Sequence, residues 1–177
     1  MDVRDIRDTL LSIDEEASLT FGQPSRKFDV VIAGGSAFML HDITKRPVTH
    51  DIDILSMDRR LAEIISHYPE VNGAMSAFLD CIPYNYEDRL IELPLVTNAI
   101  RYYTPSLEDL AVMKLYAWRP NDISDLTSRE FLDRIDWDIL HHLIFDPEEA
   151  RASSPSDRLY GELIAAYQKL RKEHGPQ

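Results

Sequence analysis

Two carboxylates placed two residues apart are the first groups in this chain that could do chemistry. Asp51 and Asp53 alternate with Ile52 and Ile54 in an otherwise apolar stretch. Because successive side chains of a strand point to opposite faces, a strand here would place both carboxylates on one face. Neighbouring carboxylates repel each other unless a cation, a proton or water lies beside them. Mg²⁺ suits such a pair, since it binds one or two carboxylates, keeps several waters and accepts phosphate oxygens.

A glycine-rich turn precedes the acidic pair. The β-branched run 30–32 leads into Gly34-Gly35-Ser36, and a short apolar segment, 37–40, follows. This pattern predicts a strand, a tight turn and a helix. The glycines let the backbone approach a ligand closely, and the start of a helix leaves N–H groups available to a phosphate. A phosphate-binding turn followed closely by a Mg²⁺ pair predicts a nucleotide site.

These residues, together with Arg46 and Thr49, resemble the signature of the nucleotidyltransferase superfamily, which has the DNA polymerase β-like fold. The likeness is closer to the small bacterial AbiEii-like branch, many of whose members belong to toxin–antitoxin systems. The resemblance implies that the two carboxylates bind the metal and take part in catalysis. It also implies nucleotide-binding roles for five residues: Gly34, Gly35, Ser36, Arg46 and Thr49.

A second block further along the chain resembles the same branch. It consists of Lys114 on an expected helix, Arg119 just after it, and Asp122 and Asp125 at the start of the next helix. In that branch the lysine and the first aspartate lie by the nucleotide and matter for activity. The resemblance therefore implies catalytic roles for Lys114 and Asp122 and a nucleotide-binding role for Arg119. The alternative is that Asp122 caps its helix and Lys114 extends from the core to solvent.

Many nucleotidyltransferases carry a third carboxylate on a later strand. The candidates here are Asp88 and Glu92, which would share one face of an expected strand over 86–93. If neither binds the cation, transfer would be slow or the site would only bind nucleotide.

The elements expected to position these residues alternate between strand and helix. Strands are expected over 28–33, 51–55, 86–93 and 99–103, while 74–82 is ambiguous. Helices are expected over 2–19, 35–41, 59–67, 123–132, 137–144 and 156–172, and another is opened by Ser106. The fold class is α/β (α+β), a small twisted mixed sheet flanked by helices. The resemblance implies a nucleotidyltransferase core over 1–104 and a C-terminal helical region over 105–177 that completes the cleft.

Composition narrows the functional classes. The 177 residues include 19 basic and 31 acidic ones, a net charge of −12. This balance argues against broad, non-specific nucleic-acid binding, which needs clustered basic residues. The single cysteine, Cys81, rules out an internal disulfide, fits a reducing compartment and is expected to be a buried structural thiol. The charged N-terminus and the lack of a membrane-length apolar run predict a soluble, cytoplasmic protein.

The predicted function is the metal-dependent transfer of an NMP unit from an NTP to an acceptor hydroxyl, with Mg²⁺ or Mn²⁺ as cofactor. The acceptor could be RNA, a protein or a small molecule, and a toxin or antitoxin partner would fit the resemblance. The alternative is a catalytically weak module that binds nucleotide or docks a partner, as an antitoxin does.

Overall fold

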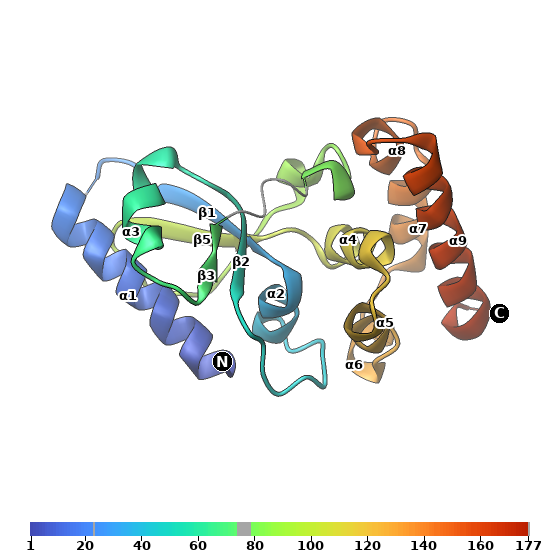
Figure 1. Ribbon diagram of the computed structural model, residues 1–177, viewed down its shortest axis with the longest axis horizontal. Helices are drawn as coiled ribbons and strands as arrows, with labels where there is room; N and C mark the ends of the chain where they lie inside the picture. Colours follow the sequence, from blue (N-terminus) through green and yellow to red (C-terminus); the bar gives the residue numbers. More distant parts are fainter. Residues whose placement is uncertain (23, 74–78, 177) are drawn as a thin grey trace. The chain divides into compact units, whose positions relative to one another are not determined.

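The computed structural model describes residues 1–22, 24–73 and 79–176, and the chain divides into two compact units. The first unit comprises Met1–His41, Arg46–Ala77 and Leu90–Thr104. The second comprises Asp42–Lys45, Phe78–Arg89 and Pro105–Gln177. Figure 1 shows the elements of both.

One mixed sheet forms the centre of the first unit. Within the described residues it has five strands: β1 (Phe28–Ala33), β2 (Ile52–Met57), β3 (Val71–Asn72), β4 (Ile91–Glu92) and β5 (Ile100–Thr104). Their order is β3-β2-β1-β5-β4. β1 pairs antiparallel with β2 and parallel with β5, whereas β2 pairs parallel with β3 and β4 antiparallel with β5. The predicted α/β class with a small mixed sheet and flanking helices is confirmed.

Helix α1 (Val3–Phe21) is amphipathic and packs on this sheet (Figure 1). Asp2 caps it by accepting the backbone N–H groups of Arg4 and Asp5. Its inward face carries a series of buried apolar residues at helical spacing: Ile6, Leu10, Ile13 and Ala17. The other helical elements of this unit are α2 (Gly34–Leu40), η1 (Arg59–Leu61) and α3 (Ala62–Ser66).

A buried aspartate joins α1 to the start of β5. The Asp14 side chain, which lies on the inward face of α1, accepts three backbone N–H bonds: from Asn98 at 2.8 Å, Ala99 at 2.8 Å and Ile100 at 2.7 Å. The Tyr102 hydroxyl donates to the carbonyl of Leu10, one turn earlier on α1, at 2.7 Å. A buried carboxylate needs such donors to offset its desolvation, so this arrangement fixes α1 against the sheet.

The second unit is helical. Its helices are α4 (Leu107–Ala117), α5 (Pro120–Leu126), α6 (Arg129–Leu132), α7 (Trp137–Phe145), α8 (Ala150–Ser153) and α9 (Asp157–His174), with the short 3₁₀ helix η3 (Tyr86–Arg89). α4 packs against α5, α7 and α9. The apolar core between them includes Leu110, Leu115, Leu140, Leu143, Leu163 and Leu170. In the part of the chain that the structure describes, no helix combines the length and the apolar character needed to cross a membrane.

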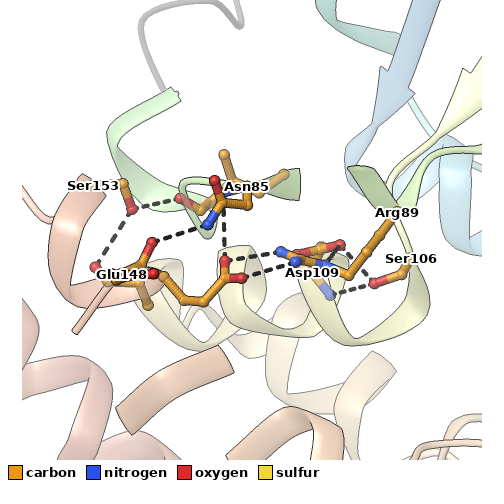
Figure 2. A network of polar contacts seen from close by, with 9 residues as sticks. Asn85, Arg89, Ser106, Asp109, Glu148 and Ser153 are labelled. Atoms are coloured by element: carbon orange, nitrogen blue, oxygen red, sulfur yellow. Dashed lines mark hydrogen bonds and ion pairs between the residues drawn. The ribbon is translucent and has the colours of Figure 1, made fainter. Parts of the chain in front are cut away.

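Within this unit, a polar cluster around Arg89 connects η3 to α4 and to the segment just before α8 (Figure 2). The guanidinium of Arg89 donates to Asp109 on α4, with its shortest bond at 2.9 Å, and to Glu149, just before α8, at 2.9 and 3.0 Å. Ser106, the cap of α4, donates its hydroxyl to Asp109 at 2.6 Å. The Asp109 side chain is fully buried and that of Glu149 is 8% exposed. Two carboxylates are therefore held inside the unit by one arginine.

Several element predictions are wrong in detail. The expected strand over 86–93 is a 3₁₀ helix followed by a two-residue strand, because the Arg89 cluster holds the first half of the segment among the helices of the second unit. The expected helix over 123–132 is two helices, α5 and α6, and α5 begins earlier, at Pro120. Ser128 interrupts it by accepting the N–H of Phe131 and so capping α6.

The helix expected over 59–67 begins as the 3₁₀ turn η1 and becomes α-helical only at Ala62. Of the ambiguous stretch 74–82, residues 74–78 lie outside the described residues. Cys81 was expected to be buried but is partly exposed, and burial and the nearby Asp80 charge raise the pKa of its thiol. A raised thiol pKa does not suit a nucleophile.

Candidate functional site

The Gly-Gly-Ser turn lies where β1 ends and α2 begins. Gly34 has a positive φ of 64°, a conformation that favours glycine. A Cβ at Gly34 would overlap Oδ2 of Asp53, and a Cβ at Gly35 would lie 2.8 Å from Nη1 of Arg46 and 3.3 Å from Oγ1 of Thr49. Gly34 is therefore favoured by its positive φ and by the close approach of Asp53, whereas at Gly35 the flexible end of Arg46 could move aside. The turn brings together Asp53, Arg46 and Thr49.

The acidic pair lies at the start of β2. Asp51 immediately precedes the strand, and Asp53 pairs with Ala33 of β1, next to the turn. Both aspartates are half-buried, whereas Ile52 and Ile54 are buried in the core. The carbonyl of Asp51 accepts the Thr49 hydroxyl at 3.3 Å. Two carboxylates two residues apart, one of them against a glycine turn, form an all-oxygen donor set of the kind that Mg²⁺ prefers.

Ser36 lies on the inner side of the turn. It is fully buried, and its hydroxyl donates to the carbonyl of Ala33 at 2.9 Å. This bond closes the turn between β1 and α2 and accounts for a serine at this position. The expected contact of Ser36 with phosphate stays a prediction.

Asn72 is next to the candidate site in the structure, but the sequence patterns do not predict it. It lies on β3 in register with Asp53, and its side-chain Nδ2 donates to Oδ1 of Asp53 at 3.1 Å. A two-residue strand has no hydrophobic period, so no local pattern indicates it. The only available signal is the short Val71-Asn72 step between Pro69 and Gly73.

The second predicted block forms a buried ion-pair cluster within the helical unit. Nζ of Lys114 lies 3.2 Å from Oδ1 of Asp122 and 2.7 Å from Oδ2 of Asp125. The Lys114 side chain is only 7% exposed, so it does not extend to solvent as the alternative expected. Oδ1 of Asp125 also accepts the Thr44 hydroxyl, at 2.6 Å. The structure brings all four residues of the block together, because Arg119 also pairs with Asp122. Their roles in nucleotide binding and catalysis stay predictions.

Asp122 combines this ion pair with a capping role at the start of α5. Its Oδ2 accepts the backbone N–H of Arg119 at 3.2 Å and the Arg119 Nε at 2.8 Å. Burial on its own would raise the pKa of Asp122, but the bond from Arg119 and the charge of Lys114 outweigh it, so the pKa lies below its ordinary value. Asp122 is thus held ionised. Its side chain also caps α5, as expected, by accepting the backbone N–H of Arg119.

The two candidates for a third carboxylate do not share a strand face. Asp88 lies in η3. Glu92 lies on the edge strand β4 and is exposed, and β5 and β1 separate β4 from β2 in the sheet. Among the described residues, no group of three or more His, Cys, Asp or Glu side chains is arranged to hold a metal ion. The expectation that Asp88 and Glu92 face the same side of one strand is therefore wrong.

Comparison with known proteins gives a family but no individual relative. No curated protein and no solved structure matches the chain significantly. A family model described as "Nucleotidyltransferase of unknown function (DUF6036)" matches residues 8–174, which span nearly the whole chain and include both predicted blocks. The chain therefore belongs to this nucleotidyltransferase family.

Proposed function

We propose that this protein transfers an NMP unit from an NTP to an acceptor hydroxyl, using Mg²⁺ or Mn²⁺ held by Asp51 and Asp53. One observation carries the proposal. In a chain that belongs to a nucleotidyltransferase family, the Asp53 carboxylate, the Arg46 guanidinium and the Thr49 hydroxyl all lie against the two glycines of one turn. An anionic group for the cation and a cationic group for the phosphates, held beside one glycine turn, are what a metal-bound triphosphate requires.

Different residues of the first unit would bind the divalent cation and the phosphates. Asp51 and Asp53 supply carboxylate oxygens for the divalent cation. When bound, that cation would neutralise charge on the phosphate oxygens and lower the pKa of the attacking hydroxyl. Arg46 would offset the charge of the phosphates with its guanidinium, and the main chain of Gly34 and Gly35 would contact the phosphates beside Asp53 and Arg46.

The proposed reaction forms one bond and breaks one. The acceptor oxygen attacks the α-phosphorus of the NTP and gives up its proton to water, while the bond from that phosphorus to the bridging oxygen of the β-phosphate breaks. Pyrophosphate leaves with the bonding electron pair. The protein's contribution is to position the groups and stabilise charge, as in other phosphoryl transfers.

The second unit and the biological setting enter the proposal through the resemblance to the AbiEii-like branch. Lys114, Arg119 and Asp122 match that branch by type and spacing and are kept as candidates for activity. A toxin–antitoxin setting, with RNA, a protein or a small molecule as acceptor, follows from the same resemblance. An NTP substrate and a single cysteine favour a cytoplasmic location.

We expect Asp53→Asn to weaken Mg²⁺-dependent NTP binding by about tenfold or more, because it removes one charge-assisted ligand worth about 1.5–3 kcal/mol. Calorimetric titration with ATP, GTP, CTP and UTP, in Mg²⁺ and in EDTA, measures the affinity. Glu92→Gln is the matched control, since it neutralises an exposed acid on the opposite edge of the same sheet. Its affinity should equal that of the wild type.

The outcomes separate the proposed function from its alternative. NTP binding that is equal in Mg²⁺ and EDTA, or absent in both, would contradict the proposal. Mg²⁺-dependent binding, followed by label from an α-³²P NTP on an acceptor, would support transfer. The same binding with no released pyrophosphate, across RNA, protein and small-molecule acceptors, would instead support the nucleotide-binding docking module.

A further inference from the structure

The strand next to β2, on the side away from β1, supplies a polar side chain to the candidate site. β3 and β2 are parallel, with Ile52 opposite Val71 and Asp53 opposite Asn72. Side chains at the same register of adjacent strands lie on the same face. Asn72 therefore stands beside Asp53, and the bond from its Nδ2 to Oδ1 of Asp53 at 3.1 Å joins the two.

The backbone fixes the place of Asn72. The N–H of Ile52 donates to the carbonyl of Glu70 at 2.9 Å, which holds the start of β3 against β2. The N–H of Val71 donates to the carbonyl of Tyr68 at 2.9 Å, which fixes the turn that leads from α3 into β3. These main-chain bonds, both just before residue 72, set the position of the Asn72 backbone beside β2.

The two oxygens of Asp53 have different neighbours. Oδ1 accepts the amide of Asn72, whereas Oδ2 lies over Gly34, where a Cβ would overlap it and would be 2.9 Å from Cγ. The carboxylate is therefore held between the glycine turn on one side and the amide of β3 on the other. With Oδ1 bonded to Asn72, Oδ2 is directed toward the turn where the phosphates would bind.

The chemistry of an amide matters at this position. An ionised carboxylate only accepts hydrogen bonds, so an amide N–H is a matched partner that adds no charge. An aspartate at position 72 would instead place a third carboxylate within hydrogen-bonding distance of Asp53. Without a cation it would repel Asp53, and with a cation it would supply another oxygen ligand.

We propose that Asn72 is the positioning residue for the Asp53 carboxylate. Its amide holds Oδ1 and directs Oδ2 toward the glycine turn. Because the amide is neutral, the pair formed by Asp51 and Asp53 keeps two negative charges, with no third beside it. This inference rests on the proposed function, because it takes the pair to be the ligands of a divalent cation. Residues that orient a metal ligand typically change metal affinity by about 10- to 100-fold when they are removed.

The test uses Mn²⁺ alone, titrated calorimetrically into the full chain, together with the melting temperature in EDTA. Asn72→Ala should weaken Mn²⁺ binding about 10- to 100-fold. Asn72→Asp should strengthen it about tenfold, because affinity rises with the number of charged ligands, and should lower the melting temperature in EDTA. Ser25→Asp adds the same charge at an exposed residue of the first unit and should change neither quantity.

Asn72→Asp is expected to raise the affinity for Mn²⁺ and to lower the melting temperature in EDTA. If Asn72 had only a structural role, the substitution would not produce these two opposite effects. Wild-type affinity in both Asn72 variants would overturn the inference, whatever their melting temperatures. If both Asn72 variants keep wild-type affinity while the wild type binds Mn²⁺ and Asp53→Asn does not, only the role of Asn72 is wrong. If the wild type binds no Mn²⁺, the proposed function and this inference fail together. If Asn72→Ala does not fold, the direction of the Asn72→Asp change in affinity decides the inference.

Discussion

Replacing Arg89 by methionine is expected to lower the free energy of unfolding of the helical unit by about 3–5 kcal/mol, the usual cost of removing one partner from a buried ion pair. The cause is the burial of its two carboxylate partners, since Asp109 is fully buried and Glu149 is 8% exposed. Without the guanidinium, two like charges would remain inside the unit. The Ser106 hydroxyl can satisfy only part of the bonding that Asp109 loses.

The two tryptophans of the chain allow a direct measurement. Trp118 and Trp137 both belong to the second unit, so their fluorescence during urea unfolding reports that unit. Arg158→Met is the matched control, because the Arg158 side chain is 75% exposed and pairs only with the exposed Glu162 among the ion pairs of the described residues. We expect that control to change stability by less than about 1 kcal/mol. Equal losses in the two variants would contradict the account of the Arg89 cluster.

The Arg89→Met defect should also depend on pH. In the native protein burial raises the pKa of Asp109, although the bonds from Arg89 and Ser106 oppose the shift. Without Arg89 the pKa rises further, so at mildly acidic pH the folded state binds a proton that the unfolded state does not. Because stability then increases as pH falls, the loss measured at pH 7 should shrink toward pH 5. A loss that stays constant or grows over this range would contradict a buried, unpaired carboxylate as the cause.

Replacing Lys114 by methionine is the second substitution with a large expected effect. The ammonium lies 3.2 Å from Asp122 and 2.7 Å from Asp125, and all three side chains are buried. The loss should again be about 3–5 kcal/mol, because two carboxylates would keep their charge in a site that excludes water. From the sequence alone this variant would be expected to fold normally, so an effect on nucleotide binding could be mistaken for a direct contact.

A double-mutant cycle separates the two effects. Combining Lys114→Met with Asp125→Asn also neutralises the carboxylate that lies closest to the lost ammonium. The double variant should therefore be more stable than Lys114→Met alone by at least about 1 kcal/mol. Lys172→Met, at an exposed residue of α9, is the control for loss of a lysine charge. If the double variant folds, its NTP affinity tests whether Lys114 contributes to binding. Strict additivity of the two changes would contradict a coupled buried cluster.

Local sequence patterns predicted the strand, the glycine turn and the second strand that carry Gly34, Gly35 and Asp53. The β-branched run, the two glycines and the alternating Asp-Ile-Asp step each specify a strand or a turn from a few consecutive residues, and the structure has β1, the turn and β2 where these patterns lie. The closeness of Asp53 to Gly34 follows from strand pairing, because Asp53 is opposite Ala33. Spacing alone could indicate that these residues cooperate, but not which oxygen of Asp53 faces the turn.

The predictions that failed depend on partners far away in sequence. The position of Arg89 is set by its bonds to carboxylates 20 and 60 residues further along the chain. Because these partners are distant in sequence, the residues near Arg89 do not indicate a 3₁₀ turn in place of a strand. Asn72 matters because β3 aligns it with a residue 19 positions earlier. A strand of two residues carries no period of its own, and its register is set only when the sheet assembles.

The three N–H bonds that Asp14 accepts have a consequence for the order in which the sheet unit opens. The amides of Asn98, Ala99 and Ile100 all donate to one side chain of α1. Exchange of the amide hydrogens of Asn98 and Ala99 with deuterium then requires α1 to separate from β5, even though these amides lie outside the helix. Their exchange rates in native conditions should match those of the buried turn around Leu10 and Ile13, so the two segments would behave as one cooperative opening unit.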